Sequence, residues 1–184
     1  PFYSGLGPCK GISPPQDPYA MYTLKEGMFH NTYFQCSPGI LIEDRIDREI
    51  ASFEKERDLL LQGIEILEKI DNPNEDLQRI TNMGKFMYRT ILTVLHRKRY
   101  YMLDQARMNA AESKEAAKHR EAVDAMLDIL QAEAENAQAA IPLVEFDSAL
   151  GYEPSMEYVT DRRRIEWKLG QLQEESAKLK IETV

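Results

Sequence analysis

The sequence predicts a mostly α-helical protein, an antiparallel up-and-down bundle of about four long helices preceded by an extended arm rich in aromatic residues and proline. Apolar residues recur at steps of three, four or seven through most of the chain after residue 41. Short or moderate links join these helical patterns, which favours antiparallel neighbours. No strand pattern of convincing length occurs, so a sheet is not expected.

Residues 1–40 form the predicted arm, and residues 41–184 form the predicted helical bundle domain. The arm holds six of the nine prolines, which fix φ and remove backbone donors, so helix and interior strand are disfavoured there. We expect its aromatic side chains to hold it against the helices. The alternative is a platform for a ligand or partner, for which the candidate residues are Tyr3, Tyr19 and Tyr22.

The first helix is predicted to begin at Ile42, with Ile46 and Ile50 on its buried face. It should end at Asp71-Asn72-Pro73, because proline disfavours a helical residue before it. Asn74 is the predicted N-cap of the second helix, and the acids that follow it favour the positive end of the helix dipole.

The third helix is predicted from the apolar stripe that begins at Val123, and it should end before Pro142. Thr160 or Ser155 is the predicted cap of a fourth helix. Three arginines open that helix, Arg162 to Arg164, which is unfavourable for its dipole. We therefore expect nearby acids, such as Asp161 or Glu153, to neutralise them, or the arginines to meet another surface.

The composition excludes several classes of protein. The chain has 184 residues, a formal net charge of -8 and a pI near 5.0, which disfavours nucleic-acid binding. No window is apolar enough for a membrane span, so a soluble protein is expected. Cys9 and Cys36 are too few for a disulfide framework or a zinc site. Two free thiols in a reducing compartment are expected, which slightly favours the cytoplasm, and a single bridge is the alternative.

No catalytic residue, cofactor site or metal site is predicted. The paired Glu-x-x-His motifs of di-metal bundles are missing, and neither a Gly-x-Ser-x-Gly motif nor a phosphate-binding loop occurs. The basic run His96-Arg97-Lys98-Arg99 lies in mid-helix, so its side chains should project around the whole circumference. It is expected to be a solvated or partner-facing surface, with an anion site as the alternative.

The irregular segment 141–158 contains four carboxylates, and paired carboxylates perform glycoside hydrolysis. Capping, turn and ion-pair roles are nevertheless expected, since Asp147 and Ser148 suit a turn. Contact with a partner or ligand is the alternative. The candidate residues for such contact in this part of the chain are Asp147, Tyr152, Glu153 and Trp167.

The strings Ile141-Pro142-Leu143-Val144-Glu145, Leu150-Gly151-Tyr152-Glu153-Pro154 and Glu166-Trp167-Lys168 resemble the C-terminal helical region of large bacterial glycoside-hydrolase-like proteins, many from gut anaerobes. The resemblance implies that a catalytic barrel or another sugar-handling domain precedes Pro1. This chain has no βα alternation to form a barrel, and no catalytic residue of the family can be matched to it. Because it starts at Pro1 in turn-forming sequence, we expect a processed product, a fragment or an excised domain.

The expected function is that of a noncatalytic helical accessory domain of a carbohydrate-active enzyme, which packs on an upstream catalytic domain of the same protein. The aromatic arm is the expected docking element. A freestanding helical module for protein–protein interaction is the alternative, and a sugar-binding module is a third candidate. Carbohydrate is therefore a further candidate partner, whereas nucleic acid and membrane are not expected partners.

Overall fold

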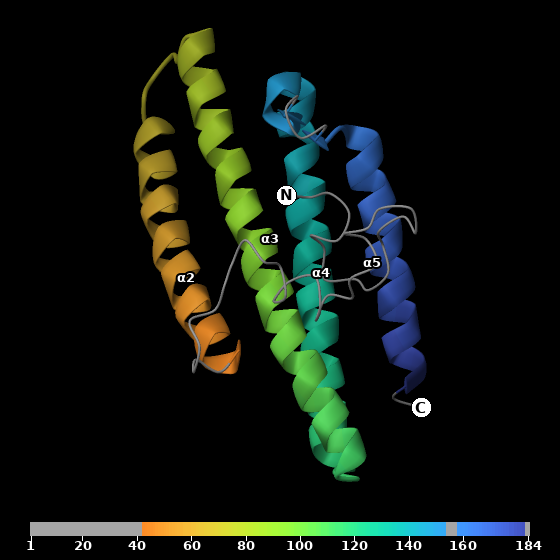
Figure 1. Cartoon of the computed structure of the whole chain (residues 1–184). Coiled ribbons are helices and arrows are strands. Elements are labelled where there is room, and N and C mark those ends of the chain that lie inside the picture. The colour runs from red at the N-terminus through yellow and green to blue at the C-terminus, as the bar shows by residue number, and fades with distance from the viewer. Residues whose placement is uncertain (1–41, 154–157, 183–184) are drawn as a thin grey trace.

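The computed structural model describes residues 42–153 and 158–182. This part of the chain confirms the mostly α-helical prediction, because its helices run up and down beside one another in chain order (Figure 1). The arm, with Tyr3, Tyr19 and Tyr22, lies outside the described residues. The helices are α2 (Ile42–Leu67), α3 (Glu75–Glu112), α4 (Ala116–Phe146) and α5 (Arg162–Glu182).

The turn between α2 and α3 begins earlier than predicted, because α2 ends at Leu67 and not at Asp71-Asn72-Pro73. Asn72 has a φ of 51°, a left-handed conformation that asparagine tolerates better than most residues. Asn74 caps α3, because its side-chain oxygen accepts a hydrogen bond of 2.9 Å from the backbone N–H of Leu77. Glu75 and Asp76 then occupy the first turn, so the predicted helix start is confirmed.

The end of α4 differs from the prediction. We expected the helix to end before Pro142, but it continues through this proline to Phe146. A proline inside a helix removes one backbone hydrogen bond, here to the carbonyl of Gln138, which belongs to an exposed residue. The next residues, Leu143 and Val144, are buried in the core, and their packing keeps the last turn helical.

A short connection joins α4 to α5. It consists of a 3-10 turn, η2 (Ser148–Gly151), and an antiparallel pair of two-residue strands, β1 (Tyr152–Glu153) and β2 (Tyr158–Val159), in which Tyr152 faces Val159. Gly151 is required there, since an added Cβ would lie 1.9 Å from the carbonyl oxygen of Thr160.

The cap of α5 is Asp161, not Thr160 or Ser155 as predicted. Its carboxylate accepts a hydrogen bond of 2.8 Å from the backbone N–H of Arg164, and it stands directly before the first helical residue. Ser155 lies outside the described residues. An aspartate also places negative charge at the positive end of the helix dipole, which a hydroxyl does not.

The described core has three apolar clusters: a small one of Ile46 and Tyr101 between α2 and α3, and two larger ones, one at each half of the bundle formed by α3, α4 and α5. One larger cluster joins Phe86 of α3 to the C-terminal half of α4 and to Ile165 of α5. The other joins Tyr100 of α3 to the N-terminal half of α4 and to Leu172 and Leu179 of α5. Helix α5 therefore packs chiefly on α4 and reaches α3 through side chains, while α2 packs on the other side of α3.

Candidate functional site

A layer of buried polar side chains separates the two larger apolar clusters. Along each of the three helices the polar residues fall between the members of one cluster and those of the other. We call this set the polar layer; it consists of Thr93 and His96 of α3, Glu133 and Asn136 of α4, and Lys168 of α5.

Glu133 is the centre of the polar layer and is 0% exposed. Its Oε1 accepts hydrogen bonds from the hydroxyl of Thr93, at 2.7 Å, and from the ammonium of Lys168. Its Oε2 lies 2.6 Å from Nδ1 of His96. One carboxylate thus joins three helices.

Asn136 completes the layer from one turn further along α4. Its amide nitrogen donates to the backbone carbonyl of Arg89, at 2.9 Å, and to the hydroxyl oxygen of Thr93, at 3.1 Å. Its amide oxygen is buried without a hydrogen-bond partner. The Thr93 hydroxyl accepts from Asn136 and donates to Glu133, so a chain of hydrogen bonds crosses from α3 to α4 twice.

The charges around Glu133 keep it ionised. Burial is the strongest influence on the pKa of Glu133 and would raise it. The charge of Lys168 and the hydrogen bonds from His96 and Lys168 act in the opposite direction, and together they hold the pKa of Glu133 below its ordinary value. The layer is therefore a buried ion pair supported by further hydrogen bonds.

This arrangement fits a structural role better than a catalytic one. Both carboxylate oxygens of Glu133 are already hydrogen-bonded, and its side chain has no solvent access. Within the described ranges, no group of three or more His, Cys, Asp or Glu side chains could hold a metal ion. The carboxylate is therefore not exposed to a substrate in this packing.

The basic run in the middle of α3 contributes a residue to each neighbouring helix, which confirms that its side chains project around the circumference. His96 turns to α4, Lys98 pairs with Glu49 of α2, and Arg99 pairs with Glu54 of α2. The expectation of a solvated or partner-facing surface is wrong for His96 and Lys98, because both are buried. Each of them has a carboxylate partner within the bundle, Glu133 for His96 and Glu49 for Lys98.

Arg97 is the member of this run that has no ion pair with the described residues. It is half-buried, and its Nε has no hydrogen-bond partner. Burial lowers the pKa of Arg97 to about 10. A guanidinium in this position still carries its charge at neutral pH, so the anion-site alternative for the run is reduced to a single side chain.

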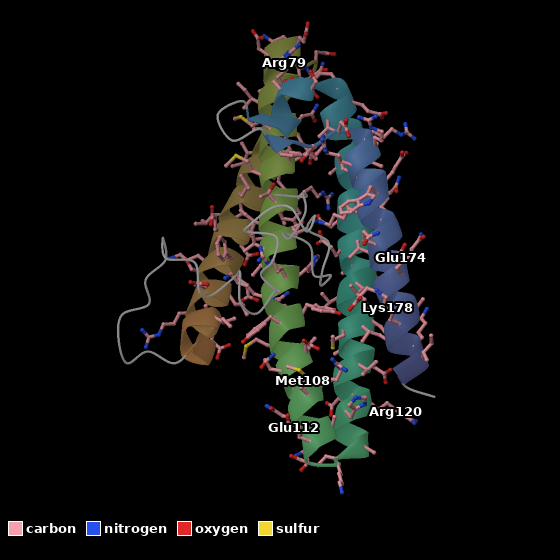
Figure 2. The ribbon with its side chains drawn as sticks, turned by 45° about the vertical axis from the view of Figure 1, so that its right-hand side comes forward. Arg79, Met108, Glu112, Arg120, Glu174 and Lys178 are labelled. Atoms are coloured by element: carbon pink, nitrogen blue, oxygen red, sulfur yellow. The ribbon has the colours of Figure 1, made fainter. Side chains whose placement is uncertain are left out.

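Asp147 has the turn role that the sequence indicates. One carboxylate oxygen accepts a hydrogen bond of 3.0 Å from the backbone N–H of Ala149, and the other lies 3.1 Å from Arg79 of α3. This side chain therefore ties the end of α4 to the start of α3. Figure 2 shows Arg79 near that end of the bundle. Its contact with a partner or ligand stays a prediction.

The other predicted contact residues fall in different places. Trp167 lies on α5 and is 46% exposed. The side chains of Tyr152 and Glu153 lie outside the described part of the chain, which gives only their backbone in β1. The structure therefore does not assemble these residues with Asp147 into one described site.

Two of the three arginines at the start of α5 have acidic partners, as expected, and the acids paired with Arg162 differ from those named in the prediction. Arg162 pairs with Glu166 and Glu145, each at 2.8 Å, and the hydrogen bonds to these two carboxylates raise the pKa of Arg162. Arg163 lies 3.8 Å from Asp161. Glu145, a carboxylate of the irregular segment, thus serves an ion pair between α4 and α5.

A surface of exposed apolar side chains lies at one end of the hairpin of α2 and α3. These side chains are between 44% and 64% exposed, whereas those of the core are at most 8% exposed. The two helices are in contact here, because a Cβ added at Gly84 would lie 3.3 Å from Ile64 and Lys85 pairs with Glu68. We call this set the hairpin surface; it consists of Leu59, Ile66 and Ile70, and of Ile80, Met83 and Met87.

The ion pair between Lys98 and Glu49 shows that the two halves of the hairpin surface share one side. On α2, steps of seven residues lead from Glu49 through Glu56 to Gly63, and Leu59 and Ile66 each follow this row by three residues, while Ile70 lies in the turn after the helix. On α3, steps of seven and four lead from Lys98 back to Met87 and Ile80. Since the two starting residues touch, both stripes lie on the same side of the hairpin.

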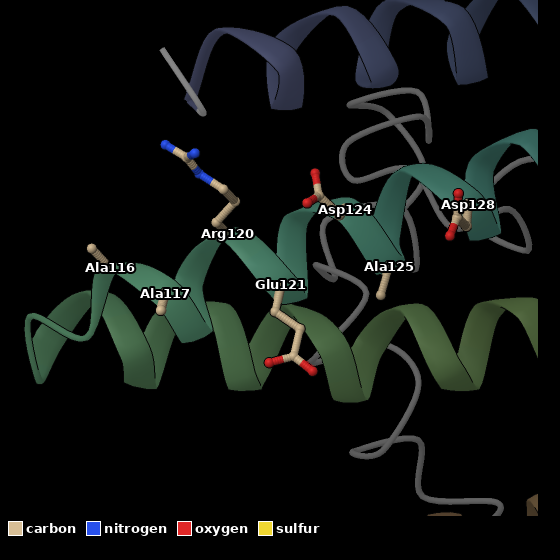
Figure 3. A pocket seen from close by; sticks show the side chains of 7 residues that line it. All are labelled: Ala116, Ala117, Arg120, Glu121, Asp124, Ala125 and Asp128. Atoms are coloured by element: carbon tan, nitrogen blue, oxygen red, sulfur yellow. The ribbon is translucent and has the colours of Figure 1, made fainter.

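A hollow on α4 is a weaker candidate. Its seven lining side chains all belong to the first half of this one helix, and Figure 3 shows Arg120 and Glu121 extending in different directions from it. The lining mixes one arginine with three acids and three alanines, and it contains no large apolar side chain. Ligand sites are mostly apolar and enclosed, so this hollow does not resemble one.

Comparisons with known proteins give no relative from which a function could be transferred. Neither a protein-family model, nor a curated protein, nor a solved structure matches the chain. Among the described helices, none is long and apolar enough to cross a membrane.

Proposed function

We propose that the chain is a noncatalytic helical domain that acts by packing against another protein domain. The observation that carries this proposal is the hairpin surface, where six large apolar side chains of α2, α3 and the turn between them are roughly half exposed. Clusters of exposed apolar side chains are typical of protein interaction sites. The polar layer supports the proposal from the other direction, because its titratable groups are closed off inside the bundle.

The proposed partner is the catalytic domain of a carbohydrate-active enzyme. This choice rests on the resemblance of segment 141–158 and of Glu166-Trp167-Lys168 to the helical region of glycoside-hydrolase-like proteins. The bundle would stabilise that domain and complete one wall of its cleft. A freestanding interaction module is the second candidate, and the same hairpin surface favours it equally.

A direct test uses the full chain and a glycoside-hydrolase domain encoded in the same gene or operon. We expect the isolated chain to hydrolyse no aryl glycoside, and the melting temperature of the catalytic domain to rise when the chain is added. Turnover by the purified chain that is lost in Asp147→Asn would overturn the noncatalytic assignment. An unchanged melting temperature, together with no complex in sedimentation, would overturn the choice of partner.

The sugar-binding alternative has its own test. Among the predicted contact residues, Trp167 is the aromatic one whose side chain the structure describes, and it is 46% exposed. Exposed aromatic rings can stack on ligands. Calorimetry with a panel of oligosaccharides would detect such binding, and Trp167→Ala should abolish it. We expect no heat of binding for the wild-type chain or for the Trp167→Ala variant.

A further inference from the structure

We propose that the hairpin surface receives a helix of the partner, which lies along the seam between α2 and α3 and carries basic residues near its ends. This inference rests on the proposed function and specifies the partner's chemistry. The occupant is inferred from the packing of the bundle, from an unexplained glycine and from the charges at the two ends of the seam.

The bundle itself shows how a further helix covers apolar side chains of a hairpin. Helix α5 packs chiefly on α4, where Ile165 and Leu172 enter the apolar clusters that α4 shares with α3, and Glu175 accepts a hydrogen bond of 2.9 Å from Tyr100 of α3. The hairpin of α2 and α3 has no such third helix among the described residues, since α2 stands at the edge of the row (Figure 1). On that hairpin the apolar side chains remain half exposed.

The stripe on α3 supports a continuous helical contact. Ile91, on the same side of α3 as Met87, is 7% exposed, whereas Met87 is 49% exposed. Ile80, Met83 and Met87 follow at steps of three and four, the spacing at which side chains of one helix pack into the grooves of another. Methionine adapts well to the shape of a partner.

Gly63 marks the point where a second helix can approach α2 closely. It lies between Leu59 and Ile66 on the helix surface, and an added Cβ would meet no atom within 4 Å. A glycine inside a helix costs about 1 kcal/mol relative to alanine, and no contact among the described residues explains it. A helix that crosses α2 at this residue would explain it, because glycine allows the shortest distance between two backbones.

The charges along the seam favour basic residues in the partner. Glu56 lies on the α2 stripe seven residues before Gly63, and Asp76 lies on the α3 stripe four residues before Ile80. Both acids are exposed, and neither forms an ion pair with the described residues. The nearby cations of α3 are already paired, Lys85 with Glu68 and Arg79 with Glu75 and Asp147. The exposed Lys55 lies at the outer edge of the surface, four residues before Leu59 and further round α2 from α3 than Glu56, and the exposed Lys69 lies in the turn after α2.

The test measures binding of a synthetic amphipathic helix to the full chain by fluorescence anisotropy. The probe is a labelled peptide of about 21 residues with a leucine stripe and lysines at both ends, and its control has glutamates in place of the lysines. We expect the lysine probe to bind at least about tenfold more tightly than the glutamate probe, a difference of about 1.4 kcal/mol. Equal affinity for both probes would overturn the assignment of a basic partner.

Substitutions then locate the contact. Ile66→Glu on α2 and Met87→Glu on α3 should each weaken the lysine probe by at least about tenfold, although each adds a negative charge that would strengthen non-specific attraction. Ile181→Glu is the matched control, because Ile181 is 75% exposed on α5, and it should leave affinity unchanged. If all three substitutions weakened the lysine probe equally, the probe would not bind at the seam between α2 and α3.

Further outcomes separate this inference from the proposed function. If Ile66→Glu converts a dimer of the wild-type chain to a monomer in sedimentation, the occupant is a second copy and the inference fails. If the catalytic domain binds the Ile66→Glu and Met87→Glu chains as tightly as the wild type, the inference fails while the proposed function stands. If the probe binds as expected but the catalytic domain does not, the seam assignment holds and the proposed partner is wrong.

Discussion

The polar layer places charged side chains in the interior, where apolar side chains are usual, and the hairpin surface places apolar side chains where polar ones are usual. The polar layer puts Glu133 and Lys168 in the interior at 0% and 2% exposure, while the hairpin surface leaves six large apolar side chains about half exposed. In the first region every charge has a partner inside the bundle. In the second region, no described part of the chain buries the apolar side chains.

The difference between the two regions separates architecture from recognition. A buried ion pair rarely adds net stability over an apolar pair of similar volume, but it penalises any arrangement in which the charges do not meet. Only one register of α5 on α3 and α4 brings Lys168 to Glu133, so the layer fixes that register. An exposed apolar surface fixes nothing within the chain, and its contribution comes when another surface covers it.

The largest expected effect is the loss of the Glu133 carboxylate. Glu133→Ala should reduce the free energy of unfolding by about 3–5 kcal/mol, because it leaves the Lys168 ammonium and the Thr93 hydroxyl buried without their main acceptor. Urea denaturation followed by circular dichroism measures this loss. The double variant Glu133→Leu with Lys168→Met removes both charges together and should be much less destabilised. A double variant as unstable as the sum of two single ones would show that the ion pair is not the important feature.

The same carboxylate predicts a dependence on pH. Because the pKa of Glu133 is lowered in the folded state, its ionisation stabilises the fold above the ordinary glutamate pKa of about 4.3, and that stabilisation is lost as the pH falls through the folded pKa. The difference in unfolding free energy between the wild type and Glu133→Gln should therefore be large at neutral pH and become smaller below about pH 4. Urea titrations at several pH values measure it, and a difference that does not change with pH would contradict the prediction.

A leucine in each region gives a smaller and more direct contrast. Leu130 is 1% exposed in the apolar cluster beside the polar layer, and Leu59 is 59% exposed on the hairpin surface. Leu130→Ala should cost about 2–5 kcal/mol, because it leaves a cavity in a packed core. Leu59→Ala should change stability by less than about 0.5 kcal/mol. If the two substitutions had similar costs in thermal or urea unfolding, Leu59 would be covered within the chain.

Much of the fold could be predicted from the sequence, because its helices are amphipathic and their boundaries have local signals. The cap at Asn74 predicted the start of the second helix correctly, whereas the first helix ends at Leu67, before the predicted Asp71-Asn72-Pro73. The rule that proline ends a helix failed at Pro142, where burial of Leu143 and Val144 in the core outweighed the loss of one backbone hydrogen bond. The cap of α5 was missed because aspartate and threonine are neighbours there and both can cap a helix.

The polar layer was missed for a different reason. Glu133 stands at a core position between Leu130 and Ala137, and Lys168 stands at a core position between Ile165 and Leu172. A charged residue inside each of two apolar stripes is the signal that could have indicated a buried pair. The sequence could not show which stripes face each other, so it could not pair these two residues. Nor could it show that part of the apolar stripe on α3 would stay exposed.

The smallest expected effect compares two glycines that have open space around them. Gly63 of α2 and Gly170 of α5 both lack any atom within 4 Å of an added Cβ, so alanine at either residue should raise the free energy of unfolding by up to about 1 kcal/mol. Gly84→Ala should raise the free energy of unfolding by a smaller amount or even lower it, because its Cβ would lie 3.3 Å from Ile64.

Binding then distinguishes the two stabilised variants. Gly63→Ala should weaken the lysine probe while Gly170→Ala should not, because only Gly63 lies where a partner helix is proposed to cross α2. Thermal unfolding and anisotropy on the same samples measure both quantities. A Gly63→Ala chain that is more stable and binds the probe with unchanged affinity would show that the partner helix does not approach α2 at this residue. Gly63 would then need another explanation, because it would lower the stability of α2 without improving binding of the partner helix.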